Sequence, residues 1–303
     1  MNRWKKTFSI QRIEPYVYLL PALLSILYWV YRPLIQTFEL SFYQWNLLPT
    51  SPKVFVAFDN YLRIFSLPDL QIAIWNTFIY MVGLWPMSLL IPLLVAILTD
   101  QTTRQYSHTY RALIFIPMIM APVVVASVWR WILHPTNGIL NATLLNFWDL
   151  ESPIRFFSDM NLAIYSIIFI TGWKIMGFSM LVFATGLTGI NREYYEAAAI
   201  DGARRSQVIW KITLPLLSPY IIFILMISTL FSAEWSFIYI NVLTQGGPLQ
   251  STTNIYYILY HYGFQTYSIG WSSSAATLFF IFFGLIAYGF VKLSQRFAYY
   301  DNE

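Results

Sequence analysis

The sequence predicts an all-α integral membrane protein with six transmembrane helices. Its composition excludes an ordinary soluble domain, because 57% of the 303 residues are apolar and only 11% are charged, whereas about a quarter are charged in a typical soluble protein. The apolar residues also form runs of roughly 20, the length that a helix needs to cross the hydrocarbon layer. In addition, the lysines and arginines gather in alternate loops.

Windows of about 20 residues locate the six spans. They lie at residues 17–40, 72–98, 112–133, 162–187, 216–242 and 275–291, of which the last is the shortest. The second span contains Pro86 and Pro92, and the third contains Pro117 and Pro122. We expect kinks there, because proline removes a backbone donor and crowds the preceding turn.

The basic residues predict the orientation of the spans. With the N-terminus in the cytoplasm, the cytoplasmic segments hold twelve of them: Arg3, Lys5, Lys6, Arg12, Arg104, Arg111, Arg192, Arg204, Arg205, Lys211, Lys292 and Arg296. The outer loops, at 41–71, 134–161 and 243–274, hold only Lys53, Arg63 and Arg155. Because loops rich in basic residues face the cytoplasm, we expect both termini on that side.

This topology divides the chain into a cytoplasmic N-terminal segment at residues 1–16, a six-span domain at 17–291 and a cytoplasmic tail at 292–303. The basic N-terminus before an apolar run is similar to a signal peptide. We nevertheless expect a retained helix, because the run is too long and no small-residue cleavage pattern follows it. The net charge of +4 is modest, and the basic residues are sorted to one side of the membrane. We therefore expect no nucleic-acid binding.

The residue types also argue against a membrane-embedded enzyme. The sequence has no cysteine, and its histidines, His108, His134 and His261, have no metal-ligand spacing with one another. No span carries a paired acid–base cluster. We therefore expect no catalytic residue and no metal site.

The longest cytoplasmic connection, residues 191–215, begins with the pattern of a short helix. Asn191 suits a helix N-cap, and Glu193 suits the positive end of the helix dipole. The alanines at 197–199 favour helix. Gly202 is placed to end it.

A second short helix is predicted after Gly202. Ser206 can cap it, and Val208, Ile209 and Ile212 share one of its faces. Pro215 is expected to close it.

Two interpretations of this connection remain open on physical grounds. Small side chains on one face let another protein approach closely, and Glu196, Asp201, Arg204 and Arg205 could fix its register. Alternatively, an amphipathic helix could lie on the membrane surface, since Arg204, Arg205 and Lys211 also suit anionic headgroups.

The connection resembles the signature loop of the permease subunits of bacterial binding-protein-dependent ABC importers. The resemblance rests on Glu196-Ala197-Ala198, on Gly202 four residues later, and on Ile212 followed by Leu214-Pro215. It implies the type I ABC importer permease fold in the bacterial plasma (inner) membrane. It also implies docking, with the loop seated as a coupling helix in a groove of an ATPase. The implied coupling residues are Glu196, Ala197, Ala198, Asp201, Gly202, Arg204 and Arg205.

Further motifs resemble the carbohydrate branch of that family, which includes the maltose-type and glycerol-phosphate-type permeases. These are Asp59-Asn60-Tyr61, Asn76-Thr77, Ile116-Pro117 through Trp129-Arg130-Trp131, Trp173-Lys174 with Gly177, and Thr244-Gln245-Gly246-Gly247-Pro248. The Gly-Gly-Pro loop is typical of the first permease of a pair, although Gln245 and the lack of a large outer insertion depart from the maltose permease. The implied solutes are monosaccharides, oligosaccharides, polyol glycosides or glycerol phosphate.

The resemblance also implies the partners of the chain. They are a second homologous permease, an ATPase dimer and an extracytoplasmic solute-binding protein. The sequence contains no G-x-x-x-x-G-K-[ST] phosphate loop. We therefore expect ATP and Mg to bind to the ATPase and no cofactor to bind to this chain.

Ionisable residues inside spans are costly and are functional candidates. On one interpretation, Trp173 and Trp235 stack on a sugar ring while Lys174, Ser232, Glu234 and Ser236 bond to its hydroxyl groups. On the other, Lys174 and Glu234 form an interhelical ion pair, which Arg130 could also reach. An ion-coupled secondary transporter that uses Lys174 and Glu234 as a relay is the rival function.

The outer loops carry two further features. The aromatic residues at 129–131 and 256–262 suit anchoring at the membrane interface or contact with a binding protein. Gln245, Gly246, Gly247 and Pro248 predict a tight turn, and the family position implies that they contact the binding protein.

Overall fold

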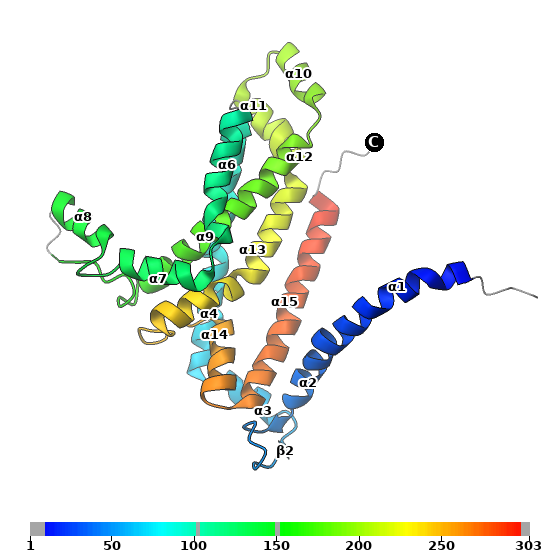
Figure 1. The fold of residues 1–303 in the computed structure, drawn as a ribbon, viewed down its shortest axis with the longest axis vertical. Helices are drawn as coiled ribbons and strands as arrows, with labels where there is room; N and C mark the ends of the chain where they lie inside the picture. The colour runs from blue at the N-terminus through cyan, green and yellow to red at the C-terminus, as the bar shows by residue number, and fades with distance from the viewer. Residues whose placement is uncertain (1–9, 101–103, 149–151, 298–303) are drawn as a thin grey trace, which may run out of the picture. The chain divides into compact units, whose positions relative to one another are not determined.

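The computed structural model describes residues 10–100, 104–148 and 152–297, and it is helical apart from one short hairpin in the described part (Figure 1). The chain divides into two compact units. The first contains the chain up to Ser66 together with Tyr262–Phe279, and the second contains Leu67–His261 with the chain from Phe280 onward. Each is described by itself.

The first unit begins with the predicted first span. Helix α1 (Ile10–Ile26), the π-helical turn η1 (Leu27–Tyr31) and helix α2 (Arg32–Leu40) follow one another without a break. Together they supply an apolar helix over Pro15–Leu40, which agrees with the predicted span at 17–40. The rest of the unit consists of strand β1 (Tyr43–Gln44), strand β2 (Val54–Phe55), helix α3 (Asp59–Phe65), the π-helical turn η5 (His261–Gln265) from its second residue onward, and the first turns of helix α15 (Ile269–Phe297).

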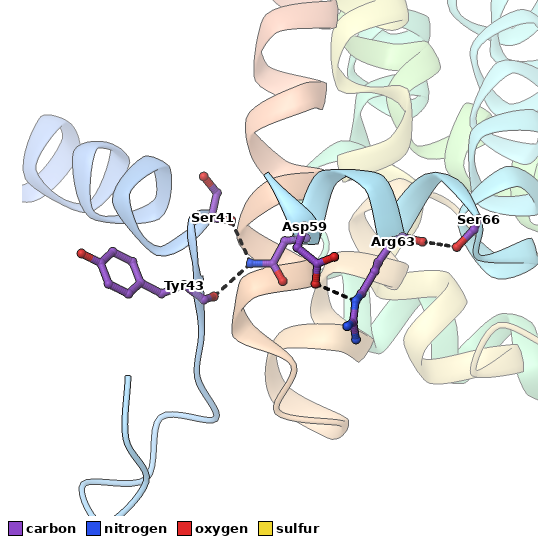
Figure 2. A network of polar contacts seen from close by, with 6 residues as sticks. Ser41, Tyr43, Asp59, Arg63 and Ser66 are labelled. Carbon is purple, nitrogen blue, oxygen red and sulfur yellow. Dashed lines mark hydrogen bonds and ion pairs between the residues drawn. The ribbon is translucent and has the colours of Figure 1, made fainter. Parts of the chain in front are cut away.

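The hairpin of the first unit is held by helix α3. Strands β1 and β2 pair antiparallel. The buried amide of Asn60 donates hydrogen bonds to the carbonyl oxygens of Ser41 and Tyr43, at 2.9 and 3.0 Å. Figure 2 shows these bonds beside an exposed ion pair of 2.7 Å between Asp59 and Arg63. The Asp59-Asn60-Tyr61 motif is therefore a structural anchor for the loop at 41–71, which is predicted to be the first outer loop.

The second unit is built around helix α9 (Ala163–Thr188), which is the fourth predicted span. It packs against helices α4 (Pro68–Trp85), α5 (Ile91–Asp100), α6 (Arg104–Ile119) and α13 (Ser218–Tyr239). In its most apolar stretch of 18 residues, 61% of the residues are buried, a larger share than in any other long apolar helix of the described residues. Helix α9 is therefore the central helix of this unit.

A close backbone approach joins α9 to α6. A Cβ atom added at Gly177 would lie 2.5 Å from the carbonyl oxygen of Ile114 and 2.7 Å from the Cα of Phe115. Such a distance excludes any side chain, so glycine lets the two backbones touch. Small residues play this part at helix interfaces in membranes, where packing replaces the hydrophobic effect.

The second and fifth spans continue through π-helical turns. Helix α4 passes through η2 (Pro86–Leu90) into α5, and helix α13 passes into η4 (Ile240–Thr244). The resulting apolar helices cover Pro68–Thr99 and Ser218–Thr244. Pro86 opens the π-helical turn, so the backbone absorbs this proline by a local change of helical register.

The third predicted span is broken rather than kinked. Helix α7 (Pro122–Ile132) leaves α6 at 97°, and Figure 1 shows the change of direction clearly. Ala121 is extended, with φ −61° and ψ 132°, as expected for a residue before proline. The described part of the chain thus has five helices suited to cross a membrane, or six if the bent pair counts as one.

The expectation that the last span is the shortest is wrong. Helix α15 has 29 residues, because it begins at Ile269 and includes three serines, Ser272, Ser273 and Ser274, that precede the predicted span at 275–291. Ser274 Oγ donates to the carbonyl of Gly270 at 2.8 Å, and Thr277 Oγ1 donates to that of Ser273 at 2.8 Å. Hydroxyl groups bonded to their own helix lower the cost of burying polar residues.

The remaining helices lie in connections. Helix α8 (Ile139–Trp148) belongs to the loop predicted as the second outer loop, and helix α14 (Ile255–Tyr260) belongs to that predicted as the third. The connection predicted to be cytoplasmic contains α10 (Arg192–Ile200), α11 (Arg205–Val208), η3 (Ile209–Thr213) and α12 (Leu214–Leu216).

Candidate functional site

Helix α10 confirms the first helix predicted in the connection at 191–215. The side chain of Asn191 caps its N-terminus by accepting a hydrogen bond of 3.1 Å from the backbone N–H of Glu193. At the other end, Gly202 has φ +69°. The N–H of Gly202 bonds to the carbonyl of Ala199, and that of Ala203 bonds to the carbonyl of Ala198, at 3.1 and 2.9 Å. This pair of bonds is the glycine-dependent helix ending that the sequence suggested.

The second helix differs from the prediction at both of its ends. Arg204, not Ser206, is its N-cap residue, and the side-chain oxygen of Gln207 accepts from the N–H of Arg204 at 2.7 Å. Pro215 does not close the helix, because it lies in the first turn of α12, where its missing N–H costs nothing. The connection therefore leads through η3 and α12 into α13.

Six of the seven predicted coupling residues are exposed on this connection. These are Glu196, Ala197, Asp201, Gly202, Arg204 and Arg205. Ala198 is buried, so it serves packing within the loop. The hydroxyl groups of Tyr195 and Thr213 lie 3.4 Å apart and join α10 to η3. Figure 1 shows α10 projecting beyond α6 and α9 at one end of the second unit.

Two exposed apolar residues of this surface were not predicted from the sequence. Ile200 is 87% exposed and Trp210 is 72% exposed. Large apolar side chains in this position, outside the predicted spans, indicate a surface that a partner covers. Their signal in the sequence was a large apolar residue next to a charged one, Asp201 after Ile200 and Lys211 after Trp210. We call the exposed residues of 196–210 the coupling surface.

A cavity of about 320 Å³ lies within the second unit, next to the break between α6 and α7. Lys174 of α9 lines it together with Glu234 and Trp235 of α13. The ammonium group of Lys174 donates a hydrogen bond of 2.9 Å to the carbonyl of Met118. The structure therefore brings three of the six predicted solute-path residues to one cavity.

The expected ion pair between Lys174 and Glu234 is not formed. The ion pairs within the described ranges join Lys53 to Glu39 and Arg63 to Asp59. Glu234 is exposed. Burial, followed by the charge of Glu234, raises the pKa of Tyr256 in helix α14.

Arg130 also does not reach Glu234. Its guanidinium group donates to the carbonyl of Val242, which lies in η4. Arg130 thus joins α7 to the end of the fifth span, and no basic side chain neutralises Glu234 within the described residues.

The other three predicted path residues lie elsewhere. Trp173 packs edge to face on Trp129, with ring centroids 5.5 Å apart. Ser232 and Ser236 are both buried, and their hydroxyl groups donate to carbonyls of their own helix, those of Thr229 and Ser232, at 3.1 and 2.7 Å. Hydroxyl groups bound in this way present no donor to a solute.

The predicted outer turn is confirmed at its glycine. Gln245 and Gly246 have φ values of +51° and +84°. A Cβ atom at Gly246 would lie 2.6 Å from Oγ1 of Thr253, so both the conformation and the available space require glycine. Gln245 is exposed and Gly246 is buried, so Gln245 is the better placed of the two for contact with a partner.

The Asn76-Thr77 motif of helix α4 positions this outer loop. The amide of Asn76 donates to the carbonyls of Gln250 and Thr253, at 3.0 and 2.9 Å. Oγ1 of Thr77 accepts from the N–H of Ile255 at 3.0 Å. These residues are separated by more than 170 positions in the chain, so the sequence alone could not connect them.

No group of three or more His, Asp or Glu side chains that could hold a metal ion occurs in the described part of the chain. The outer turn, the cavity around Lys174 and the coupling surface contain the site residues that were predicted from the sequence and that the structure leaves accessible. They belong to the second unit.

The chain is similar to a known family and to known proteins over most of its length. The family described as "Binding-protein-dependent transport system inner membrane component" matches residues 73–298. The "probable ABC transporter permease protein YesP" of Bacillus subtilis (strain 168) is 31% identical and covers 99% of this chain and 96% of its own length. The "sn-glycerol-3-phosphate transport system permease protein UgpA" of Brucella abortus is 29% identical, over 97% of this chain and 99% of its own.

A solved structure has the same fold. It belongs to a bacterial ABC transporter involved in the import of the acidic polysaccharide alginate, and its matching chain is 26% identical, with a TM-score of 0.82 over 96% of this chain and 98% of that one. A second structure holds the alginate transporter in complex with a periplasmic protein bound to an alginate pentasaccharide, and it matches with a TM-score of 0.81.

Proposed function

The chain belongs to the family of binding-protein-dependent transport system inner membrane components, the permease subunits of ABC importers, and we propose that it passes a sugar or sugar-like solute into the cytoplasm. The ATPase of such importers is on separate subunits. The observation that carries the proposal is the coupling surface, an exposed short helix with a fixed glycine ending and two exposed apolar side chains.

The coupling surface transmits motion from the ATPase. Binding of ATP and Mg closes an ATPase dimer, and the closure pushes on Glu196, Ala197, Asp201, Gly202, Arg204 and Arg205. The push shifts the permease from inward-open to outward-open, and hydrolysis resets it. The bond between Tyr195 and Thr213 supports this role, because it makes α10 and η3 move together.

The cavity around Lys174 is the candidate solute path. Glu234 supplies acceptors and Trp235 supplies an aromatic face. Because its volume of about 320 Å³ is small for an oligosaccharide, a second homologous permease completes the path. Trp173, Ser232 and Ser236 hold the walls of the path in place and do not contact the solute.

The solute class rests on the relatives. The named permeases include permease proteins of glycerol-3-phosphate transport systems, and the solved structures belong to bacterial importers of alginate. Monosaccharides, oligosaccharides, polyol glycosides and glycerol phosphate share hydroxyl groups that such a cavity can bind. A solute-binding protein delivers the solute, and we assign Gln245, Gly246, Gly247 and Pro248 to its contact.

The topology and the cofactors complete the proposal. Both termini lie in the cytoplasm, residues 17–291 form the permease domain, and residues 1–16 and 292–303 flank it. The chain itself has no nucleotide site, so ATP and Mg bind only to the ATPase.

Purification and uptake test the proposal together. A tagged chain should bring down an ATPase and a second permease, and vesicles containing the complex should take up solute only with ATP and the binding protein. Uptake by the purified chain alone, driven by an ion gradient and indifferent to ATP, would instead establish a secondary transporter that uses Lys174 and Glu234. Thermal stabilisation of the binding protein by a panel of sugars identifies the solute.

A further inference from the structure

A second cleft lies in the first unit, apart from the cavity around Lys174. Its volume is about 580 Å³, and it is formed by the β1–β2 loop, helix α3 and the segment that begins α15. The side chains that characterise it are aromatic rings, amides and hydroxyl groups. They include those of Gln44, Trp45, Ser51, Asn60, Tyr267 and Trp271.

The cleft is held in shape by backbone contacts. Asn60 is 3% exposed and its amide fixes the carbonyls of Ser41 and Tyr43, as Figure 2 shows. A Cβ atom at Gly270 would lie 2.3 Å from the carbonyl oxygen of Tyr43. The N–H of Ile269 also donates to the carbonyl of Trp45 at 3.2 Å. The two loops therefore meet at a distance that only glycine allows.

Strained backbone lies on both sides of the cleft. Leu47 has φ +63° and Tyr267 has φ +54°, and each is a bulky residue in the left-handed region. Such conformations are unfavourable for residues with a side chain and cluster at binding sites. Strain in the two loops that form one cleft supports a selected shape rather than a chance hollow.

Several polar groups of the cleft lack protein partners. Within the residues that the structure describes, the side-chain amide of Gln44, the hydroxyl of Ser51 and the indole N–H of Trp271 make no hydrogen bond to protein. The oxygen of the Asn60 amide also accepts none, although both of its bonds as a donor are formed. Donors and acceptors thus converge on the cleft beside aromatic rings.

The charge of the lining selects the class of ligand. No Asp, Glu, Lys, Arg or His is among the described residues that line the cleft. The nearest basic residue along the chain, Lys53, is engaged by Glu39 at 2.8 Å and by the ring of Tyr43 at 4.1 Å. A phosphate or carboxylate would therefore find no counter-charge, whereas hydroxyl groups and apolar ring faces would be matched.

We propose that this cleft binds an uncharged saccharide, at a site distinct from the solute path. The predicted topology places both of its loops on the outer side, where solute arrives. The inference rests on the proposed function only because that function gives the permease an outer side at which solute arrives. Its role is to hold a sugar at the outer face of the permease.

The test measures sugar binding to the purified complex of permeases and ATPase in nanodiscs, with no solute-binding protein present. The probes are glucose, maltose, cellobiose and xylobiose, with glucose 6-phosphate as the charged comparison, and saturation-transfer NMR titration gives each Kd. At least one neutral sugar should bind more tightly than glucose 6-phosphate. The double variant Gln44→Ala/Ser51→Ala, which removes side chains without protein partners, should raise that Kd at least tenfold.

Matched variants separate the possible outcomes. Asn137→Ala/Ser158→Ala removes an exposed amide and an exposed hydroxyl from another outer loop, and it should leave the Kd unchanged. The proposal is overturned if no neutral sugar binds, if the cleft variant binds like the unmodified complex, or if Glu234→Gln alone abolishes the signal. In a separate docking assay, in which the sugar-free binding protein is added to the same nanodiscs, the proposal is also overturned if docking is the only property that the cleft variant weakens. Failure of the proposed function would appear separately, as loss of ATP-driven uptake.

Discussion

The ammonium group of Lys174 donates to the carbonyl of Met118, 2.9 Å away, and this carbonyl is the acceptor that Pro122 leaves without its helical donor. A residue at 122 with an N–H would bond to Met118 in a continuous helix. Proline has no N–H, so the break between α6 and α7 exposes a carbonyl within the membrane-spanning region. Lys174 satisfies that carbonyl from the neighbouring helix α9.

Replacing Lys174 by Met should destabilise the chain. The change keeps the length of the side chain but leaves the carbonyl of Met118 unpaired, at a cost of about 1–3 kcal/mol. Thermal unfolding of the purified complex in detergent should occur at a lower temperature, whereas Lys174→Arg should retain most of the stability. Unchanged unfolding with lost uptake would assign Lys174 to the solute instead.

The variant Glu234→Gln should impair uptake and leave assembly intact. Glu234 forms no ion pair in the described part of the chain and lines the cavity, so its loss removes acceptor strength without breaking a structural contact. Uptake and the yield of the assembled complex should be measured on the same preparations. Normal uptake would remove Glu234 from the solute path.

Substituting Gly202 by Leu should uncouple the ATPase from transport. Residue 202 has φ +69°, but a Cβ atom there meets nothing within 4 Å, so the cost within the chain comes from the backbone and is about 1–2 kcal/mol. Gly202→Asn is the matched control, since Asn tolerates this conformation. ATP-driven uptake should fall for Leu and persist for Asn in complexes that still assemble. Equal uptake by both variants would contradict a role in coupling.

The variant Ile200→Ser should weaken attachment of the ATPase. The side chain is 87% exposed, so the change should not affect folding of the permease. Burying such a side chain under a partner contributes roughly 1.5–3 kcal/mol, which corresponds to at least a tenfold loss of affinity. Copurification at graded detergent and salt concentrations measures the loss, with Ile200→Val as control. Full retention of the ATPase by the Ser variant would move the interface elsewhere.

The variant Asn76→Asp should release the third outer loop. The carboxylate has nearly the same size as the amide but cannot donate to the carbonyls of Gln250 and Thr253. Limited proteolysis from the outer side should then cut residues 245–254 faster. The control Gln245→Ala changes an exposed residue of the same loop and keeps the bonds of Asn76, so it should be cut at the rate of the unmodified protein. Equal cleavage rates for all three proteins would show that the anchor is dispensable.

Much of the fold could be predicted because its signals are local. The spans at 17–40, 72–98 and 162–187 follow from continuous apolar runs. Likewise, the capping by Asn191 and the glycine ending at Gly202 depend only on neighbouring residues. Short-range signals were therefore sufficient to predict helix α10.

The remainder depends on contacts between distant segments. A proline signals a disturbance, but the sequence does not say whether Pro122 kinks or breaks its helix, since that depends on whether Lys174 satisfies the freed carbonyl. The opposite charges of Lys174 and Glu234 within predicted spans suggested an ion pair, yet the rotation of each helix about its axis decides which groups meet. The predicted span at 275–291 omits the serines of α15, because hydropathy does not register that a hydroxyl group is bonded to its own helix.

The contact of Gly177 with the backbone of Ile114 has a mechanical consequence. Two helices whose main chains are in contact cannot slide past each other without a clash, so we expect α6 and α9 to move together as one rigid body. Only three residues separate the end of α9 from the start of α10. We therefore expect a displacement of α10 to be transmitted through α9 and α6 to the break beside Met118, where the chain changes direction by 97°.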